Sequence, residues 1–145
     1  MSDFEQLLDV KYDEATSTKM PLPPADDYNG IIGKIEGREV QTKDGPRNIM
    51  RLPIKLDGFD GFPVNHDLWL DMNEAGDGMD MSEGKNLKLG QVRKALGQNE
   101  KGVPWSPRML EGQLIRVRID HRPDKNDPEI VYAEVKRVGA VGQEL

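Results

Sequence analysis

Residues 87–122 read LKLGQVRKALGQNEKGVPWSPRMLEGQLIRVRIDHR, a stretch in which two different periodicities follow each other. Over residues 87–96, leucine and valine recur at helical spacing and leave lysine and arginine on the opposite side, which is typical of an amphipathic helix. Over residues 113–122, apolar and charged residues alternate, with Ile115, Val117 and Ile119 on one side. The stretch therefore predicts a short helix that leads into a half-buried strand.

Four more strand-like runs surround this stretch, over residues 28–39, 47–56 and 66–70 before it and 130–138 after it. A Lys-Asp-Gly-Pro turn at residues 43–46 joins the first two runs and predicts a hairpin. Gly30, Gly33 and Gly37 in the first run predict bends, which a small barrel needs in order to close. Three strands, a helix and two strands is the order of the oligonucleotide/oligosaccharide-binding (OB) fold. We therefore predict a mainly β protein with a five-stranded, OB-fold-like Greek-key barrel and one helix between strands 3 and 4.

The first 27 residues differ in composition from the rest, since they contain seven acidic residues and only Lys11 and Lys19 as basic ones. Phe4, Leu7 and Leu8 stand at helical spacing and predict a short amphipathic helix over residues 3–10. A proline-rich segment follows and predicts an extended chain. We expect an N-terminal helix and acidic arm at residues 1–27, an OB-fold domain at 28–141 and a short tail at 142–145. The apolar side of the helix is expected to pack on this domain, with a partner as the alternative.

The net charge of −6 argues at first against a nucleic-acid partner, but the acidic residues are unevenly distributed. Residues 57–83 contain eight acidic residues and no lysine or arginine, and residues 1–27 are acidic as well. The remainder of the chain carries more basic than acidic residues. Because the local field steers a polyanion, a basic surface on the domain stays compatible with nucleic-acid binding.

Strand alternation directs a set of basic and aromatic side chains outward from the predicted barrel. Cations along the phosphates and aromatic rings under the bases are what holds single-stranded nucleic acid. The predicted phosphate contacts are Lys34, Arg38, Arg51, Lys55, Arg116 and Arg118, and the predicted base-stacking residues are Trp69 and Tyr132. The structural alternative is an ordinary solvated face, with Trp69 packed under a loop or under the arm.

Enzymatic chemistry finds little support in the residues. The chain has no cysteine, only two histidines (His66 and His121), no Walker-type phosphate loop and no serine nucleophile motif. The acidic stretch resembles an oxygen-rich metal loop, but Ala75 and Ser82 stand where a calcium loop needs ligands. We predict no catalytic residue, no metal ligand and no cofactor, and a metal-dependent nuclease stays as a third alternative. No run is long enough for a membrane span and no signal peptide is recognised, so a cytoplasmic protein is expected.

Several short motifs occur in a recognisable order. Residues 21–45, PLPPADDYNGIIGKIEGREVQTKDG, lead into the first strand and its hairpin. DLWLDM at 67–72 forms an aromatic third strand, LGQVRKALG at 89–97 carries a Leu-Gly motif, and LEG at 110–112 introduces the fourth strand. Over roughly residues 21–138, this order resembles a family of small phage-encoded OB-fold single-stranded DNA-binding proteins. Ala25, Asp26 and Asp27 replace the small residue and glycine usual in that family, so the turn into the first strand is expected to differ.

The resemblance implies sequence-nonspecific binding of single-stranded DNA in phage replication or recombination, in the cytoplasm of an infected bacterial host. Phage proteins of this class often end in an acidic tail that recruits partners, whereas here the acidic segment is N-terminal. Self-association, or contact with phage or host replication proteins, is therefore expected through residues 1–27. The alternative function is that of a phage structural or assembly module that uses this arm to reach neighbouring subunits.

Overall fold

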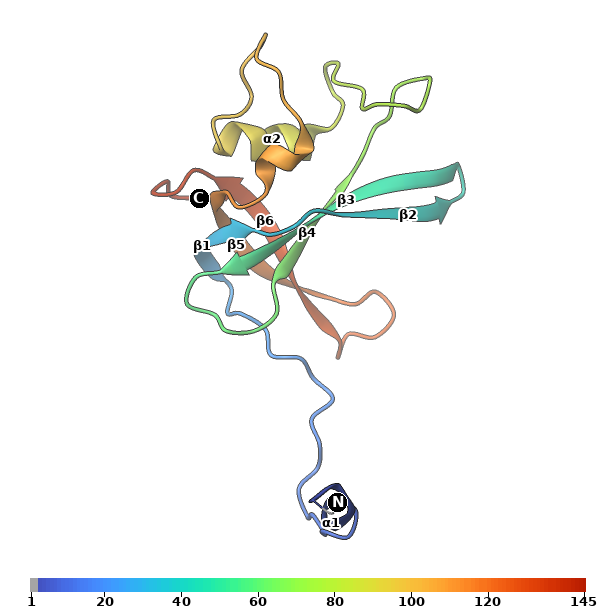
Figure 1. Ribbon diagram of the computed structural model, residues 1–145, viewed down its shortest axis with the longest axis vertical. Helices are drawn as coiled ribbons and strands as arrows, with labels where there is room; N and C mark the ends of the chain where they lie inside the picture. The colour runs from blue at the N-terminus through green and yellow to red at the C-terminus, as the bar shows by residue number, and fades with distance from the viewer. Residues whose placement is uncertain (1–2) are drawn as a thin grey trace.

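Six strands form one antiparallel sheet in the computed structural model of the chain, which describes residues 3–145 (Figure 1). In chain order, the strands are β1 (Asp26–Ile32), β2 (Glu36–Thr42), β3 (Gly45–Leu56), β4 (Val64–Trp69), β5 (Leu114–Pro123) and β6 (Val131–Gly139). The sheet order is β2-β3-β1-β5-β6, and β4 pairs with β3. The predicted mainly β class and the hairpin around residues 43–46 are confirmed.

The first predicted strand is divided into β1 and β2, which both pair with β3. The break lies opposite Pro53, which has no N–H group to continue the ladder; its carbonyl accepts a hydrogen bond from Gly33 N at 2.7 Å. Close packing explains the glycine before the break, since a Cβ atom at Gly30 would lie 2.6 Å from Ile54 Cγ2. The sheet therefore has six strands instead of the predicted five, because the first run bends along the edge of β3.

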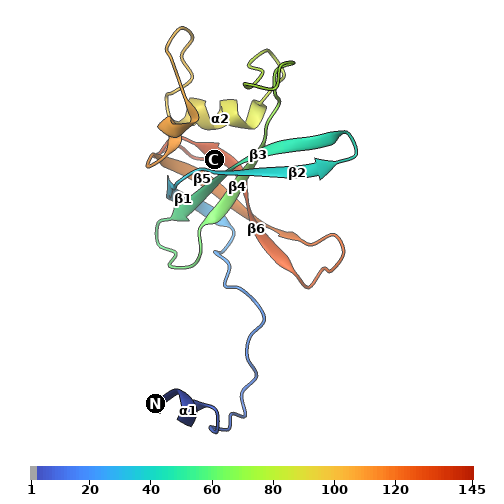
Figure 2. The same cartoon turned by 45° about the vertical axis from the view of Figure 1, so that its right-hand side comes forward.

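Helix α2 (Leu87–Ala95) lies across one end of the strands, as Figures 1 and 2 show. A short 3₁₀ helix, η1 (Pro107–Leu110), precedes β5. Both helices contribute to one core with the inward side of the sheet. Its buried members are Ile32, Met50, Leu52, Ile54, Leu56, Val64, Leu68, Leu89, Val92, Leu110, Ile115, Val117 and Ile119. No helix within residues 3–145 is long and apolar enough to span a membrane.

The sheet is open between β4 and β6. These strands are neighbours in space, but the ladders of residues 3–145 include no pairing between them. We call this gap between β4 and β6 the seam. Helix α2 packs against β6 beside it. A fully hydrogen-bonded closed barrel, as predicted from the segment order, is therefore not what the described chain forms.

Alternation predicts Val131, Ala133 and Val135 on the inward side of β6, and the structure agrees for the last two. A β-bulge between Arg118 and Ile119 shifts the pairing of β5 with β6, so that Arg118 pairs with Arg137 and Ile119 with Val135. Val135 and Val138 both pack against the core, while Val131 is exposed. Ala133 and Val135 keep the expected alternation, and the bulge at Lys136 then shifts the inward side of the strand to Val138.

The N-terminal arm extends away from the sheet and ends in α1 (Asp3–Leu7), as both ribbon views show. The helix is shorter than predicted and none of its residues is buried. Phe4 and Leu8 are 69 % and 64 % exposed, so the expected packing of this helix on the domain does not occur. The arm is attached only near its end, where Pro23 is buried and its carbonyl lies 2.7 Å from His121 Nε2.

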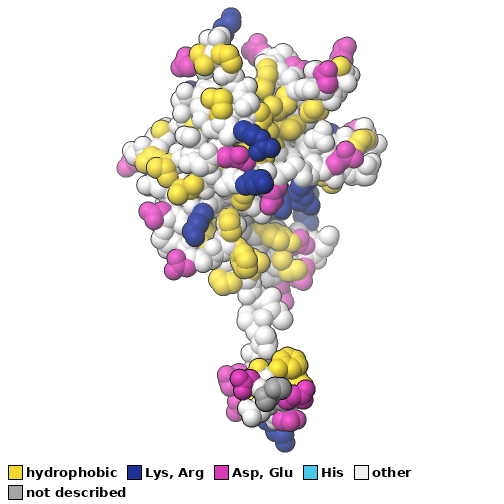
Figure 3. All heavy atoms as spheres, in the orientation of Figure 1, with side chains coloured by type: hydrophobic (Ala, Val, Ile, Leu, Met, Phe, Trp, Pro, Cys, Tyr) yellow, Lys and Arg dark blue, Asp and Glu magenta, His cyan; other side chains and the backbone are white. Residues whose placement is uncertain are grey.

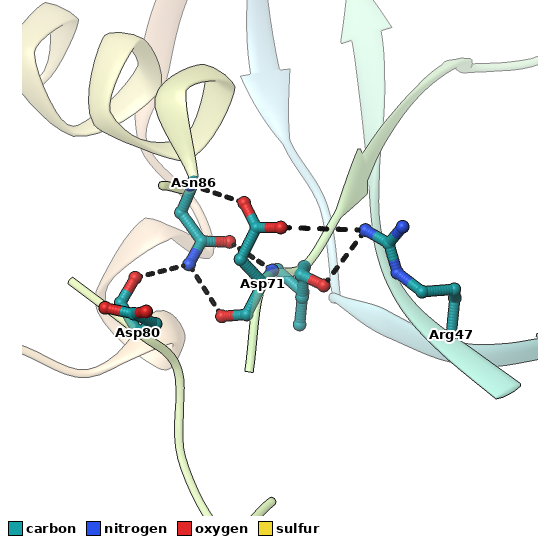
Figure 4. Close-up of polar contacts among 5 residues, drawn as sticks. Arg47, Asp71, Asp80 and Asn86 are labelled. Atoms are coloured by element: carbon teal, nitrogen blue, oxygen red, sulfur yellow. Dashed lines mark hydrogen bonds and ion pairs between the residues drawn. The ribbon is translucent and has the colours of Figure 1, made fainter. Parts of the chain in front are cut away.

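Asn86 organises the acidic loop between β4 and α2 (Figure 4). Its backbone is left-handed, with φ at 50°, a conformation that asparagine tolerates better than most residues. The side-chain Nδ2 donates to the carbonyls of Asp71 and Asp80, at 2.9 and 2.8 Å, and Oδ1 accepts from Asp71 N at 2.9 Å. Asp71 also lies 3.8 Å from Arg47 of β3. The loop is thus fastened at its base to both α2 and β3.

Candidate nucleic-acid interface

The outer side of β2, β3 and β4 brings three predicted residues together with two others. Ile49 of β3 pairs with Arg38 of β2 on one side and with Trp69 of β4 on the other. Arg47 and Arg51 flank Ile49 on the same side of β3, because alternate residues of a strand share a face. We call Arg38, Arg47, Ile49, Arg51 and Trp69 the outer face.

Trp69 is the most exposed aromatic element of the outer face, with 46 % of the residue accessible. The guanidinium of Arg47 lies 5.6 Å from the centroid of the indole ring, within cation–π range. Ile49 is only 5 % exposed although it lies outside the main core cluster, so its neighbours on the outer face cover it. The outward orientation predicted for Trp69 is confirmed, and neither the arm nor a loop buries it.

Arg51 is held by a carboxylate. Its Nε and Nη2 atoms donate to the two oxygens of Asp67 on β4, at 2.8 and 2.9 Å. These hydrogen bonds lower the pKa of the Asp67 carboxyl, and they raise the pKa of Arg51. A bidentate pair of this kind fixes the guanidinium but offsets its charge. Arg38, which has no ion pair within residues 3–145, and Arg47 with its long contact to Asp71 are the more available cations here.

Lys55, Arg116 and Arg118 lie on a different part of the sheet, the outer side of β1, β5 and the end of β3. Arg116 Nη1 donates to Asn29 Oδ1 at 2.9 Å. Arg118 lies 3.5 Å from Asp27 and 3.3 Å from Asp120, so two carboxylates offset its charge. Lys34 is exposed in the connection between β1 and β2. The predicted basic set is therefore divided between two faces and the connection between β1 and β2.

Tyr132 lies in neither of these faces, but on the β5–β6 hairpin. Its hydroxyl donates to Asp124 Oδ1 at 3.1 Å, and this hydrogen bond raises the pKa of the phenol. The guanidinium of Arg122 lies 5.5 Å from the ring centroid. The ring is 42 % exposed, so part of its surface remains open for stacking.

A wide groove of about 1010 Å³ connects this hairpin with the outer face. Residues 18–23 of the arm form part of its wall, and the loop before β4 contributes the exposed ring of Phe62. Arg51 and Asp67 line it on the sheet side, and Arg122 and Tyr132 on the hairpin side. We call this space the hairpin groove. It extends the outer face toward the second predicted stacking residue.

Figure 3 shows how charge is distributed on one side of the molecule. Lys and Arg side chains gather over the strands in the middle of the body, with Asp and Glu side chains between them and around the periphery. The arm and its helix carry a separate group of acidic side chains. The basic character is thus local, as the uneven composition predicted.

Sequence reasoning missed Arg47, Arg122 and Phe62 as members of this surface. Arg47 shares the strand face of Arg51, and Arg122 pairs across the hairpin with Tyr132, so extending the alternation would have found both. No signal in the sequence marks Phe62, because it lies in a loop whose path depends on the fold.

Trp105 has a structural role. Trp105 donates from Nε1 to Gln98 Oε1 at 2.9 Å, and the Arg93 guanidinium stacks 4.0 Å from its ring centroid. It packs against the core, which makes it a cover for the core edge. Within the described part of the chain, no three His, Asp or Glu side chains are grouped so that they could hold a metal ion.

Comparison with known proteins adds no assignment: no family model matches the chain, and no curated protein matches it in sequence.

Proposed function

We propose that the protein binds single-stranded DNA without sequence preference, and that its sheet is an OB-type barrel left open at one seam. The observation that carries the proposal is Trp69, half exposed on a strand face beside Arg47 and in one row with Arg38 across Ile49. Neither arginine has a close carboxylate partner within residues 3–145. An aromatic ring beside cations on an exposed sheet fits base stacking combined with phosphate contact. A role in phage DNA replication or recombination rests on the motif order in residues 21–138.

The strand pairings support the barrel part of this proposal. The bent first run pairs with β3 and β5, β3 pairs with β4, and β5 pairs with β6. These are the neighbours that an OB-type barrel requires, apart from the missing ladder across the seam. In such barrels, the second and third strands form the binding surface. The corresponding strands here are β3 and β4, which carry Arg47, Arg51 and Trp69.

Titration with oligo-dT is the direct test, with tryptophan fluorescence as the signal. We expect quenching at low salt, because a base that stacks on Trp69 changes the environment of the indole. About four phosphate contacts would make the affinity fall roughly 50-fold between about 50 and about 200 mM NaCl. Duplex DNA of the same length is the control and is expected to bind more weakly. Absence of quenching by a folded protein at low salt would refute the proposal.

The exposed N-terminal helix favours a second candidate, an assembly module. Phe4, Leu7 and Leu8 present apolar surface on an arm that lies away from the sheet, where a neighbouring subunit could cover it. Removal of residues 1–17 tests this candidate, because it leaves Pro23 and the wall of the hairpin groove in place. Loss of oligomers in light scattering with unchanged oligo-dT affinity supports assembly. Tighter DNA binding by the truncated monomer instead supports an acidic arm that competes with DNA.

A further inference from the structure

The seam between β4 and β6 contains a polar cavity that the outer face does not use. Its volume is about 300 Å³, and residues of β4, α2 and β6 line it. The polar members of its lining are His66, Lys88, Gln91, Glu134, Lys136 and Arg137. Two apolar residues of β6, Val135 and Val138, complete it. The cavity occupies the place where a ladder would close the barrel.

The charges around the seam cavity are predominantly positive. Lys88 comes from α2, and Lys136 and Arg137 come from β6; none of the three forms an ion pair within residues 3–145. The single acidic residue of the lining, Glu134, accepts a hydrogen bond from Arg122 at 3.1 Å. Three cations therefore face a cavity whose only carboxylate already has a partner.

His66 forms the inner wall of the cavity. It is 8 % exposed and lies on the inward side of β4, between Val64 and Leu68. Its ring nitrogens have no hydrogen-bond partner in the described chain, and they are not among the fully buried atoms that lack one, so they open to the cavity. Burial, with Lys88 nearby, lowers the pKa of His66 to about 4. The imidazole is thus neutral near neutral pH and offers one N–H donor to a ligand.

We propose that the seam cavity binds a phosphate group. Phosphate oxygens are strong acceptors that favour ammonium and guanidinium donors, and Lys88, Lys136 and Arg137 supply these. Gln91 and the neutral His66 add uncharged donors that need no counter-charge. The phosphate could belong to a nucleic-acid strand that crosses the seam, or to a free phosphate compound. The site is separate from the outer face, since His66 points inward on β4 whereas Trp69 points outward.

The two histidines of the chain make a sharp test possible, because each reports on a different place. His66 lines the seam cavity and His121 lines the hairpin groove. Their ring resonances in NMR spectra can be assigned with His121→Gln. Titration with pyrophosphate at constant ionic strength is expected to shift the His66 resonances in a saturable manner and to leave those of His121 unchanged. Absence of a saturable His66 shift would overturn the proposal.

Variants of the cavity rim identify the ligands. Lys88→Gln and Arg137→Gln are each expected to weaken pyrophosphate binding about tenfold, since each removes one charge-assisted contact. Lys101→Gln is the matched control, because Lys101 is an exposed cation in the loop between α2 and η1 and does not line the cavity, and it is expected to leave the affinity unchanged. Equal effects of all three substitutions would show that pyrophosphate is held only by general electrostatic attraction. That result would also refute the proposed phosphate site.

The same spectra with oligo-dT distinguish the two sources of phosphate. If the oligonucleotide shifts His66 and Lys88→Gln abolishes that shift, the strand crosses the seam. If pyrophosphate shifts His66 but bound oligo-dT does not, the cavity serves a free phosphate compound. Failure of oligo-dT to bind at all, with the pyrophosphate shift intact, refutes the proposed function and leaves the seam site standing.

Discussion

Trp69→Ala is expected to weaken the binding of labelled oligo-dT by roughly ten- to a hundredfold, as measured by fluorescence anisotropy. The indole is the only large ring on the outer face. Arg38 of β2 lies in the same row, on the other side of Ile49 of β3. Truncation removes the stacking surface and also the ring on which the Arg47 guanidinium rests. Trp69→Phe retains a smaller ring and is expected to bind between the parent protein and the alanine variant.

Trp105→Phe is the matched control for this experiment. Trp105 packs on the core and donates a hydrogen bond to Gln98, so its replacement is expected to leave the oligo-dT affinity unchanged. Urea unfolding of each variant separates binding from stability, because the half-exposed Trp69 still covers part of Ile49. A Trp69→Ala protein that is folded and binds oligo-dT as tightly as the parent would remove the outer face as the binding site.

The strands could be predicted because their information is local. Ile115, Val117 and Ile119 alternate with charged residues, and all three are fully buried. Met50, Leu52 and Ile54, at alternate positions of β3, are buried as well. A strand with one buried face has an apolar residue at every second position. For the same reason, the outward direction of Trp69 could be predicted from its position next to Leu68.

The grouping of the candidate site residues could not be predicted in the same way. Alternation tells which residues point outward, but it does not tell which strands share a side of the molecule. Arg51 and Arg118 both point outward, yet they lie on different faces and each faces a carboxylate of a neighbouring residue. These pairings depend on the register between strands, and the bulge after Arg118 shows how one residue can change that register.

Whether the sheet closes could not be predicted either, because closure depends on contacts between segments that are still further apart in the sequence. The segment order predicts which strands exist, whereas the open seam depends on what fills the space between β4 and β6. That space is lined by His66 and by polar residues of α2 and β6. The hydrogen bonds of Asn86 could not be predicted from the sequence for a similar reason. Its left-handed backbone and its contacts with Asp71 and Asp80 arise only when the loop folds back.

His66 predicts how stability changes with pH. In the unfolded chain, the imidazole has an ordinary pKa of 6.5, whereas burial lowers the pKa to about 4 in the folded protein. Between these two values, the unfolded state binds more protons, so acidification favours unfolding. The free energy of unfolding is therefore unaffected by His66 above pH 6.5. It decreases as the pH falls toward 4, by about 3 kcal/mol in total. Urea unfolding at a series of pH values measures this loss.

Replacement of each histidine isolates the cause. His66→Gln removes the buried imidazole from the seam, so its free energy of unfolding is expected to change much less between pH 6.5 and 4 than that of the parent. His121→Gln is the matched control and is expected to keep the full dependence, since His121 is exposed. The Arg51–Asp67 pair contributes little in this range, because a lowered carboxyl pKa affects stability mainly below the ordinary Asp value of 3.8. A parent protein whose stability stays flat from pH 6.5 to 4 would show that His66 is not buried in the neutral form, and the seam cavity would then lack its uncharged inner wall.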